Sequence, residues 1–181
     1  MSATATVTTE ELLSDRQREG RFELVRGELL ERAVPNYGNG RIAITTAFVV
    51  GGFVRQHGLG DLVSESGFVF ERDPDTVFLP DLSFVRADRV PPLDQQQGYP
   101  ELVPDFVIEI LAPSNTAPET AERVRIYLET GVLLVWLLNP RQRSITVHTP
   151  DHVARTLFED DTIDGGEVLP EFAVRVGQLF A

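Results

Sequence analysis

Two acidic residues lie inside apolar segments of the chain, and they are the side chains best placed to do chemistry. Glu109 lies in PDFVIEIL, residues 104–111, and Asp81 lies in FLPDLSFVR, residues 78–86. An ionised carboxylate in a buried strand costs several kcal/mol, roughly, unless a cation or hydrogen-bond donors compensate for its charge. One divalent metal ion shared by the two carboxylates would provide that compensation. In the alternative interpretation, each acid ends a strand and pairs with an arginine.

Neighbouring strands are needed to bring these two acids together. Residues 104–111 predict a buried central strand, because their apolar side chains leave no polar face. Residues 132–138, VLLVWLL, predict a second buried strand. Residues 87–103 predict a long polar loop, of a length that is often functional. Upstream, a turn at 73–75 divides a meander of four short strands, 61–66, 67–72, 76–80 and 81–86.

A helix is predicted directly after the central strand, over residues 118–130, PETAERVRIYLET. Pro118 suits its first turn, and Gly131 suits its end. Arg123 lies on the flank of the predicted buried stripe, which consists of Ala121, Val124 and Leu128. Two further helices are predicted, over residues 8–19, where Thr8 and Glu11 fit a capping box, and over residues 41–56.

The N-terminal segment RFELVRGELLER, residues 21–32, predicts a β-hairpin with its turn at Gly27. Glu23 and Glu28 flank that turn, and the residues alone favour solvent-facing strand positions for both. Residues 33–40 predict a loop. The C-terminal third predicts further strands, a hairpin around DDTIDGGE and a small terminal helix.

The composition is that of a soluble globular protein, with 42% hydrophobic and 24% charged residues, and we expect one domain over residues 1–181. No apolar run approaches the roughly 20 residues that cross a bilayer, and the N-terminus shows no basic segment followed by an apolar one. Cysteine is absent, which excludes disulfides, thiolate catalysis and cysteine-bound zinc. We therefore expect a cytoplasmic protein that does not bind membranes.

The charge balance limits the partners of the chain. The net charge is −12, which argues against extended, non-specific binding to a phosphate backbone but leaves room for a local basic groove. All sixteen basic residues are arginine, so no mechanism can use an ε-amino group. The histidines are scattered, and His148 and His152 flank a turn where solvated side chains are expected.

The order of acids, strands and helix resembles the Uma-type (Uma-two) restriction endonuclease family, a branch of the PD-(D/E)xK nuclease superfamily. The resemblance covers nearly the whole chain, and its specificity comes from the order and spacing of its segments. These segments are FELVRGELLE, NGRIA, GFVF, PDLSFVRADRV, PDFVIEILAPSNTA, RVRIYLETGVLLVWLLNP and EDDTIDGGEVLPEF.

The resemblance implies roles for four residues. Asp81 corresponds to the motif aspartate and Glu109 to the motif glutamate, which hold Mg²⁺ or Mn²⁺ in such nucleases. Glu23 is implied as an accessory acid of the metal site. The superfamily lysine commonly follows two residues after the glutamate, where this chain has Leu111. In Uma-type proteins it stands in the next helix, at the position of Arg123.

Arg123 is therefore the main departure from the family pattern. Arginine keeps the positive charge and binds phosphate, but it cannot act as a general base, because its pKa stays above about 12. The resemblance predicts a guanidinium directed toward Asp81 and Glu109, and the alternative is a surface ion pair with Glu119. Asn39 and Asn139 are smaller departures, at positions where relatives often have histidine and aspartate.

Together these features predict an α/β (α+β) restriction-endonuclease-like core, with a mixed β-sheet flanked by helices and additional β-hairpins. The function implied is that of a metal-dependent DNA endonuclease, with Asp81, Glu109 and Arg123 as catalytic residues, impaired if the lysine is essential. The alternative is a non-catalytic descendant that binds nucleic acid or another protein. Cleavage of both DNA strands would favour a homodimer, because each site cuts one strand.

Overall fold

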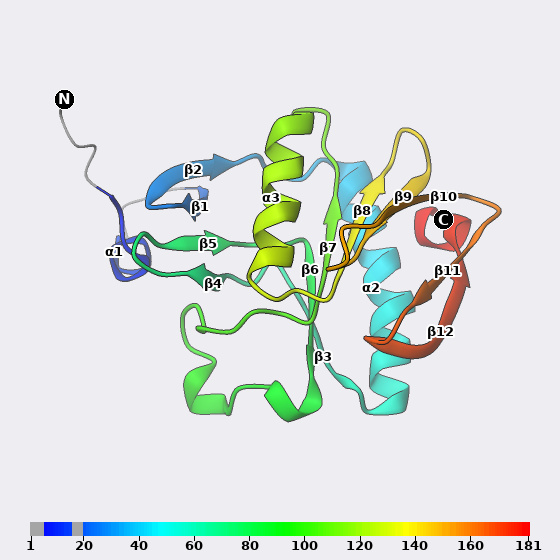
Figure 1. Ribbon diagram of the computed structural model, residues 1–181, viewed down its shortest axis with the longest axis horizontal. Coiled ribbons are helices and arrows are strands. Elements are labelled where there is room, and N and C mark those ends of the chain that lie inside the picture. The colour runs from blue at the N-terminus through cyan, green and yellow to red at the C-terminus, as the bar shows by residue number, and fades with distance from the viewer. Residues whose placement is uncertain (1–5, 16–19) are drawn as a thin grey trace.

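The computed structural model describes residues 6–15 and 20–181 and has an α+β fold, as the sequence predicts (Figure 1). A six-stranded sheet has the order β10-β9-β8-β7-β6-β3, a four-stranded sheet has the order β2-β1-β5-β4, and β11 pairs with β12. In chain order, the elements are α1 (Thr9–Ser14), β1 (Arg21–Val25), β2 (Glu28–Arg32), α2 (Tyr37–His57), β3 (Gly60–Ser64), β4 (Phe68–Glu71), β5 (Thr76–Phe78), β6 (Leu82–Arg86), β7 (Phe106–Ile110), α3 (Ala117–Glu129), β8 (Leu134–Asn139), β9 (Ser144–His148), β10 (Ala154–Phe158), β11 (Thr162–Gly165) and β12 (Leu169–Arg175), with 3-10 turns at Ala87–Arg89, Leu93–Gln95 and Val176–Phe180.

Strand β7 lies inside the six-stranded sheet, antiparallel to β6 and parallel to β8. Leu82 pairs with Ile108, so extending this register by one residue places Asp81 opposite Glu109. Successive side chains of a strand point to opposite faces, so Asp81 shares a face with Val85, and Glu109 shares a face with Val107. Val85 and Val107 pack in one apolar cluster, so the two acids lie on the same face of the sheet.

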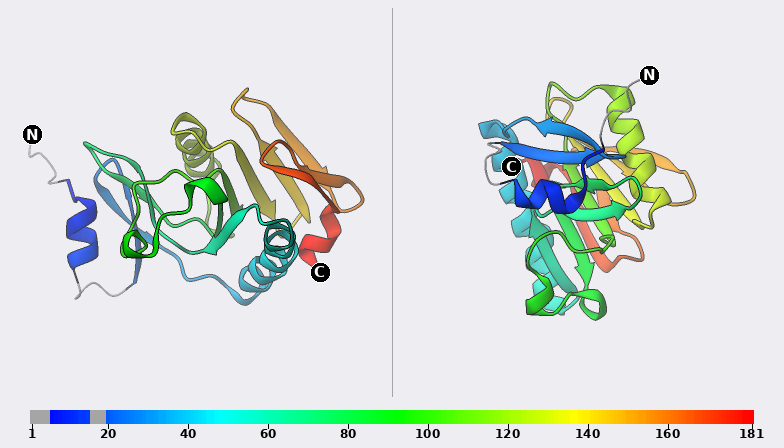
Figure 2. Two further views of the ribbon diagram at one scale, coloured as in Figure 1. Left: turned by 90° about the horizontal axis from the view of Figure 1, so that it is seen from below. Right: turned by 90° about the vertical axis from the view of Figure 1, so that its left-hand side faces the viewer.

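The two faces of this sheet are covered by different helices (Figure 2). On one face, Val50 and Val54 of α2 pack in a core with Phe106 and Trp136, and the C-terminal segment joins the same core. On the other face, α3 packs its Tyr127 side chain with Phe78 and Val107, among other residues. Helix α3 therefore covers the face that carries the two acids.

The hairpin of β1 and β2 forms as predicted. Arg26 and Gly27 make its turn, and both have positive φ, 50° and 77°. Such angles match the twist of a two-residue hairpin loop. Strand β1 also pairs with β5, which connects the hairpin to the rest of the fold. The predicted four-strand meander is wrong in its pairing, because β4 and β5 leave the central sheet and join β1.

The helices begin and end at recognisable caps. Helix α2 begins at Tyr37, earlier than predicted, because Asn36 accepts a hydrogen bond from the Asn39 amide and caps it; the second half of the predicted loop 33–40 is therefore helical. Helix α3 is capped by a Thr116–Glu119 capping box. Helix α1 has the predicted Thr8–Glu11 box, and the last residues of the helix expected to reach 19 lie outside the described residues. Among the helices in the described ranges, none has the length and apolar character needed to cross a membrane.

Candidate active site

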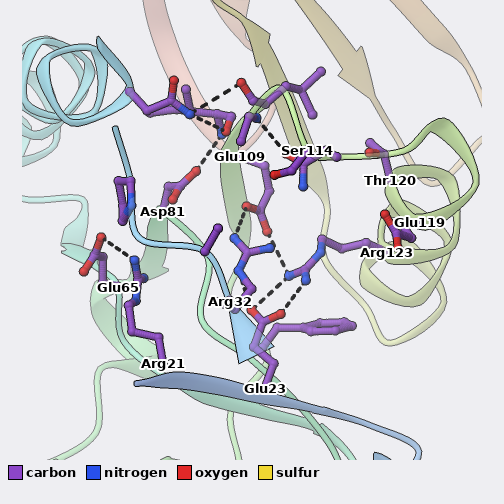
Figure 3. A pocket seen from close by; sticks show the side chains of 18 of the residues that line it. Arg21, Glu23, Arg32, Glu65, Asp81, Glu109, Ser114, Glu119, Thr120 and Arg123 are labelled. Carbon is purple, nitrogen blue, oxygen red and sulfur yellow. Dashed lines mark hydrogen bonds and ion pairs between the residues drawn. The ribbon is translucent and has the colours of Figure 1, made fainter. Parts of the chain in front are cut away.

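A cavity of about 1040 Å³ opens between the N-terminal hairpin, the start of α2, the end of β7 and α3 (Figure 3). Its wall contains Glu23, Asp81, Glu109 and Arg123, the four residues that the sequence singled out. They come from β1, the residue before β6, β7 and α3, so four separate elements contribute to one pocket. The cavity therefore brings three acids and one cation together in one place.

Asp81 is held by the backbone of the neighbouring strand. Its Oδ2 atom accepts a hydrogen bond of 2.7 Å from the Ile110 amide, next to Glu109. Burial and the negative charge of Glu109 raise the pKa of Asp81 to about 7, although the Ile110 amide and two arginines act in the opposite direction. Negative charge at the Asp81–Glu109 pair is thus incompletely compensated by the protein, which is the situation a cation would relieve.

Glu109 is buried and has three side-chain partners among the described residues, of which the sequence resemblance predicted only Arg123. The Tyr127 hydroxyl donates a hydrogen bond to its Oε1 atom, and Arg123 Nη1 lies 3.3 Å from the same oxygen. Arg32 Nη2 lies 3.6 Å from the other oxygen. Burial and the charge of Glu109 raise the pKa of Tyr127 well above its ordinary value, so Tyr127 is a neutral hydroxyl donor near neutral pH.

Glu23 is fully buried, which contradicts its interpretation as a solvent-facing strand residue. Its Oε1 atom accepts hydrogen bonds from the Leu79 amide at 2.8 Å and from Arg123 Nη1 at 3.0 Å. Its other oxygen pairs with Arg123 Nη2. Both faces of β1 are covered at this point, since Leu24 is also buried, and strand alternation therefore does not bring Glu23 into solvent.

The guanidinium of Arg123 points into the cavity and contacts Glu109, as predicted, but its second carboxylate partner in the described residues is Glu23 and not Asp81 (Figure 3). It does not pair with Glu119 there. It also lies 4.4 Å from the centre of the Phe78 ring, in a cation–π contact. Burial disfavours its charged form, but Tyr127, Glu109 and Glu23 outweigh that effect and raise the pKa of Arg123 above its ordinary value. Glu119 instead caps α3 through Thr116.

Two further arginines line the cavity, and the sequence analysis did not single them out. Arg21 and Arg32 are directly opposite each other in the β1–β2 register, so their side chains share a face. Arg21 pairs with Glu65 at 3.1 Å, and its Nη2 atom is buried without a hydrogen-bond partner in the described part of the chain. Arginines at both ends of the segment RFELVRGELLER were the signal for this pair, because a two-residue turn places them together.

In the described residues, no three carboxylates or histidines lie close enough together to hold one metal ion. Glu23 is separated from the Asp81–Glu109 pair by the guanidinium groups that bind it. Two carboxylates still suit Mg²⁺, which is commonly held by one or two protein carboxylates together with water and substrate phosphate. The donor set therefore fits a magnesium ion held by Asp81 and Glu109.

The positions that depart from the family pattern have structural roles here. The side-chain amide of Asn39 donates to the carbonyl oxygens of Ile110 and Leu111, at 3.3 and 3.4 Å, and so ties α2 to the end of β7. Asn139 accepts hydrogen bonds from the amides of Arg141 and Gln142 in the turn between β8 and β9. Both asparagines therefore hold backbone, and of the two only Asn39 lines the cavity.

Comparison with known proteins finds a matching family and a similar fold. Residues 8–177 match the model of the Uma2 family, which is described as "Putative restriction endonuclease". The fold is similar to the crystal structure of "a putative nuclease belonging to DUF820" from Anabaena variabilis ATCC 29413, with a TM-score of 0.83 and 21% sequence identity. That similarity covers 96% of this chain and 97% of the other, and it shows a shared fold. A search of curated proteins gave no match.

Proposed function

Because the chain belongs to the Uma2 family, we propose that it is a metal-dependent endonuclease that hydrolyses phosphodiester bonds in DNA. The observation that supports this proposal is the juxtaposition of Asp81 and Glu109, opposite each other on one sheet face and in one cavity with Arg123. Two acids with a nearby cation are the parts that phosphodiester hydrolysis with a metal ion requires.

Asp81 and Glu109 would hold Mg²⁺ or Mn²⁺. When bound, the ion would polarise the phosphodiester and lower the pKa of a water molecule. The Ile110 amide fixes one oxygen of Asp81, and the other oxygen has no hydrogen-bond partner among the described residues. The Tyr127 hydroxyl donates a hydrogen bond to one oxygen of Glu109 and orients it. Both carboxylates are therefore oriented by the protein itself, without a metal ion.

Arg123 would contact the substrate phosphate and offset charge that develops in the transition state. It would not remove a proton from water, since its pKa is raised above the ordinary arginine value. Glu23 engages two guanidinium nitrogens of Arg123, and we infer that its role is to position this arginine. A role for Glu23 as a third metal ligand, which the sequence resemblance implies, would require Arg123 to move away from it.

A second candidate is a non-catalytic protein that keeps the fold and binds nucleic acid or another protein. The observation that favours it is that Arg32 and Arg123 both form ion pairs with Glu109, where they compete with a metal ion for the same carboxylate. The absence of lysine at the family position points in the same direction.

Cleavage of labelled DNA by the purified protein separates the two candidates. We expect Mg²⁺ or Mn²⁺ to stimulate cleavage, EDTA to stop it and Glu109→Gln to abolish it. Glu159→Gln is a matched control, because Glu159 also pairs with an arginine but on the exposed surface. Mn²⁺ binding without cleavage would contradict the nuclease proposal and favour the binding protein.

A further inference from the structure

The electrostatics of the cavity argue against an intact duplex as its ligand. Acids outnumber arginines in its wall, which contains Glu23, Glu31, Glu65, Asp81, Glu109, Glu119 and Glu122 beside Arg21, Arg32 and Arg123. Most arginines elsewhere in the described residues also stand in ion pairs with carboxylates. Duplex DNA carries one negative charge per about 1.7 Å and binds where basic residues neutralise it. A single strand carries half that charge along its length.

The reactive groups lie deep in the cavity. The side chain of Glu109 is only 7% exposed and that of Arg123 only 15%. A phosphate must therefore enter the cavity to reach them. In a duplex, each phosphate is flanked by stacked base pairs that cannot follow it inside, whereas an unpaired nucleotide can leave the stack and enter a pocket.

One side of the cavity mouth is apolar and exposed. Leu30, Val34 and Ile44 line the cavity and are 44%, 83% and 73% exposed. Tyr37, at the start of α2, is 90% exposed and lies seven residues before Ile44, so the two side chains are on the same helix face. We call these four residues the apolar rim. All four rim side chains are uncharged, and three of them, Leu30, Val34 and Ile44, line the candidate catalytic cavity.

We propose that the cavity takes an unpaired nucleotide of a single-stranded nucleic acid, with its phosphate toward Asp81 and Glu109 and its base against the apolar rim. This inference rests on the proposed function, because the phosphodiester defines which end of the nucleotide faces the acids. Bases of a single strand are free to stack on aromatic and apolar side chains, and this stacking adds to whatever contacts the phosphates make. The cavity of about 1040 Å³ is of the size that binds small organic groups.

Fluorescence anisotropy with a labelled 12-nucleotide single strand and the duplex of the same sequence tests this proposal. Ca²⁺ is used in place of Mg²⁺, because it prefers the same oxygen ligands, and a gel checks that the DNA stays intact. We expect the single strand to bind at least tenfold more tightly than the duplex. Tyr37→Ser and Ile44→Ser should each weaken single-strand binding about fivefold or more.

Phe158→Ser is the matched control, because Phe158 is also exposed, at 56%, but lies on β10 and does not line the cavity. It should leave binding unchanged, and melting temperatures will check that all three variants are folded. Equal or tighter binding of the duplex overturns the proposal, as does an equal effect of Phe158→Ser. A dimer that Ile44→Ser dissociates, seen by sedimentation, would instead assign the rim to a second copy of the chain. Single-strand preference without metal-dependent cleavage would leave this inference standing and contradict the nuclease proposal.

Discussion

Glu23, Arg32, Glu109 and Arg123 form one buried network of ion pairs at the bottom of the cavity. In such a network the attraction between charges offsets a large desolvation cost, so removing one partner leaves an uncompensated buried charge. The same side chains would have to bind metal and phosphate. A substitution in this network is therefore expected to change both the free energy of unfolding and the cleavage rate, and both must be measured.

Arg123→Lys introduces the lysine that the sequence resemblance implies at this position. Lysine cannot reproduce the two-nitrogen contact with Glu23, so we expect a modest loss of stability, on the order of 1–3 kcal/mol. Mg²⁺-dependent cleavage should rise about tenfold or more, which corresponds to about 1.4 kcal/mol in the barrier. Arg125→Lys, on the exposed side of the same helix, is the control for both measurements. An unchanged rate with metal still bound would show that the arginine is not what limits catalysis.

Glu23→Gln removes the charge that holds Arg123 but keeps the shape of the side chain. We expect the free energy of unfolding to fall by about 3 kcal/mol, because a buried guanidinium loses its closest partner. Urea denaturation measures this change, and the exposed Glu159→Gln variant should unfold almost like the wild type. If the two variants unfold alike, Glu23 does not carry the network.

The raised pKa of Asp81, about 7, predicts a pH dependence of stability in metal-free buffer. The folded protein keeps the proton up to about pH 7, whereas the unfolded chain loses it near the ordinary value of 3.8. The favourable contribution is therefore complete below about pH 4 and is lost as the pH rises toward and through 7, by up to about 4 kcal/mol. Asp81→Asn should remove this loss and be more stable than the wild type at pH 8, but not at pH 4.

Thermal unfolding in EDTA across this pH range provides the measurement. Added Mg²⁺ should then stabilise the wild type at pH 8 and leave Asp81→Asn unchanged, since binding to the folded state raises stability. Parallel pH profiles for the two proteins would contradict the assigned burial of a charged Asp81.

Among the structural elements, the β1–β2 hairpin has the largest influence on the site, because it supplies Glu23, Arg21 and Arg32. Helix α3 supplies Arg123 and Tyr127, whose side chains lie one helical turn apart and reach the same carboxylate. Strand β7 supplies Glu109 between them. The geometry of the cavity thus depends on a local turn in the hairpin as much as on the central sheet.

Gly27→Ala tests this dependence. Gly27 has φ of +77°, and an added Cβ would lie 2.6 Å from Thr6 Cβ, so both backbone strain and a clash are expected. We expect a loss of about 1–3 kcal/mol in unfolding free energy, together with weaker Mn²⁺ binding if the hairpin orients the site. Gly52→Ala is the contrasting change, because an added Cβ would meet no atom within 4 Å among the described residues, apart from its own stretch of helix. Alanine also favours a helix, so the change should be neutral or stabilising by up to about 1 kcal/mol.

At the scale of the whole molecule, the net charge of −12 limits which nucleic acids can bind, and arginine is the only basic residue other than histidine. In the described residues, carboxylates pair with many of the arginines, among them Arg72, Arg86 and Arg125, and so offset the positive charge that a basic surface would need. The homodimer predicted from double-strand cleavage stays a prediction. Cleavage of a single strand would not require a dimer, since one site is enough. We therefore expect a protein that prefers single strands to sediment as a monomer, and one that cuts both strands of a duplex to sediment as a dimer.

The sequence by itself determined the elements and the acids. Apolar runs predicted β7 and β8, caps and glycines predicted α3 and the hairpin, and the isolated acids Asp81 and Glu109 stood out because apolar neighbours make them costly. These signals are local, since each depends on residues within a few positions in the chain. The start and end of α3 also fixed its phase, which placed Arg123 on the flank of the buried stripe. Its direction toward the acids came from the family resemblance.

Only the tertiary structure decided what covers each face and which charges meet. Glu23 and Arg123 are 100 residues apart in the chain, and no periodicity relates them. The alternation of a strand shows which side chains share a face, but not whether that face meets solvent, and for this reason the burial of Glu23 was missed. The pairing of β4 and β5 with β1, and the approach of Arg32 and Tyr127 to Glu109, likewise depend on long-range packing that local patterns do not encode.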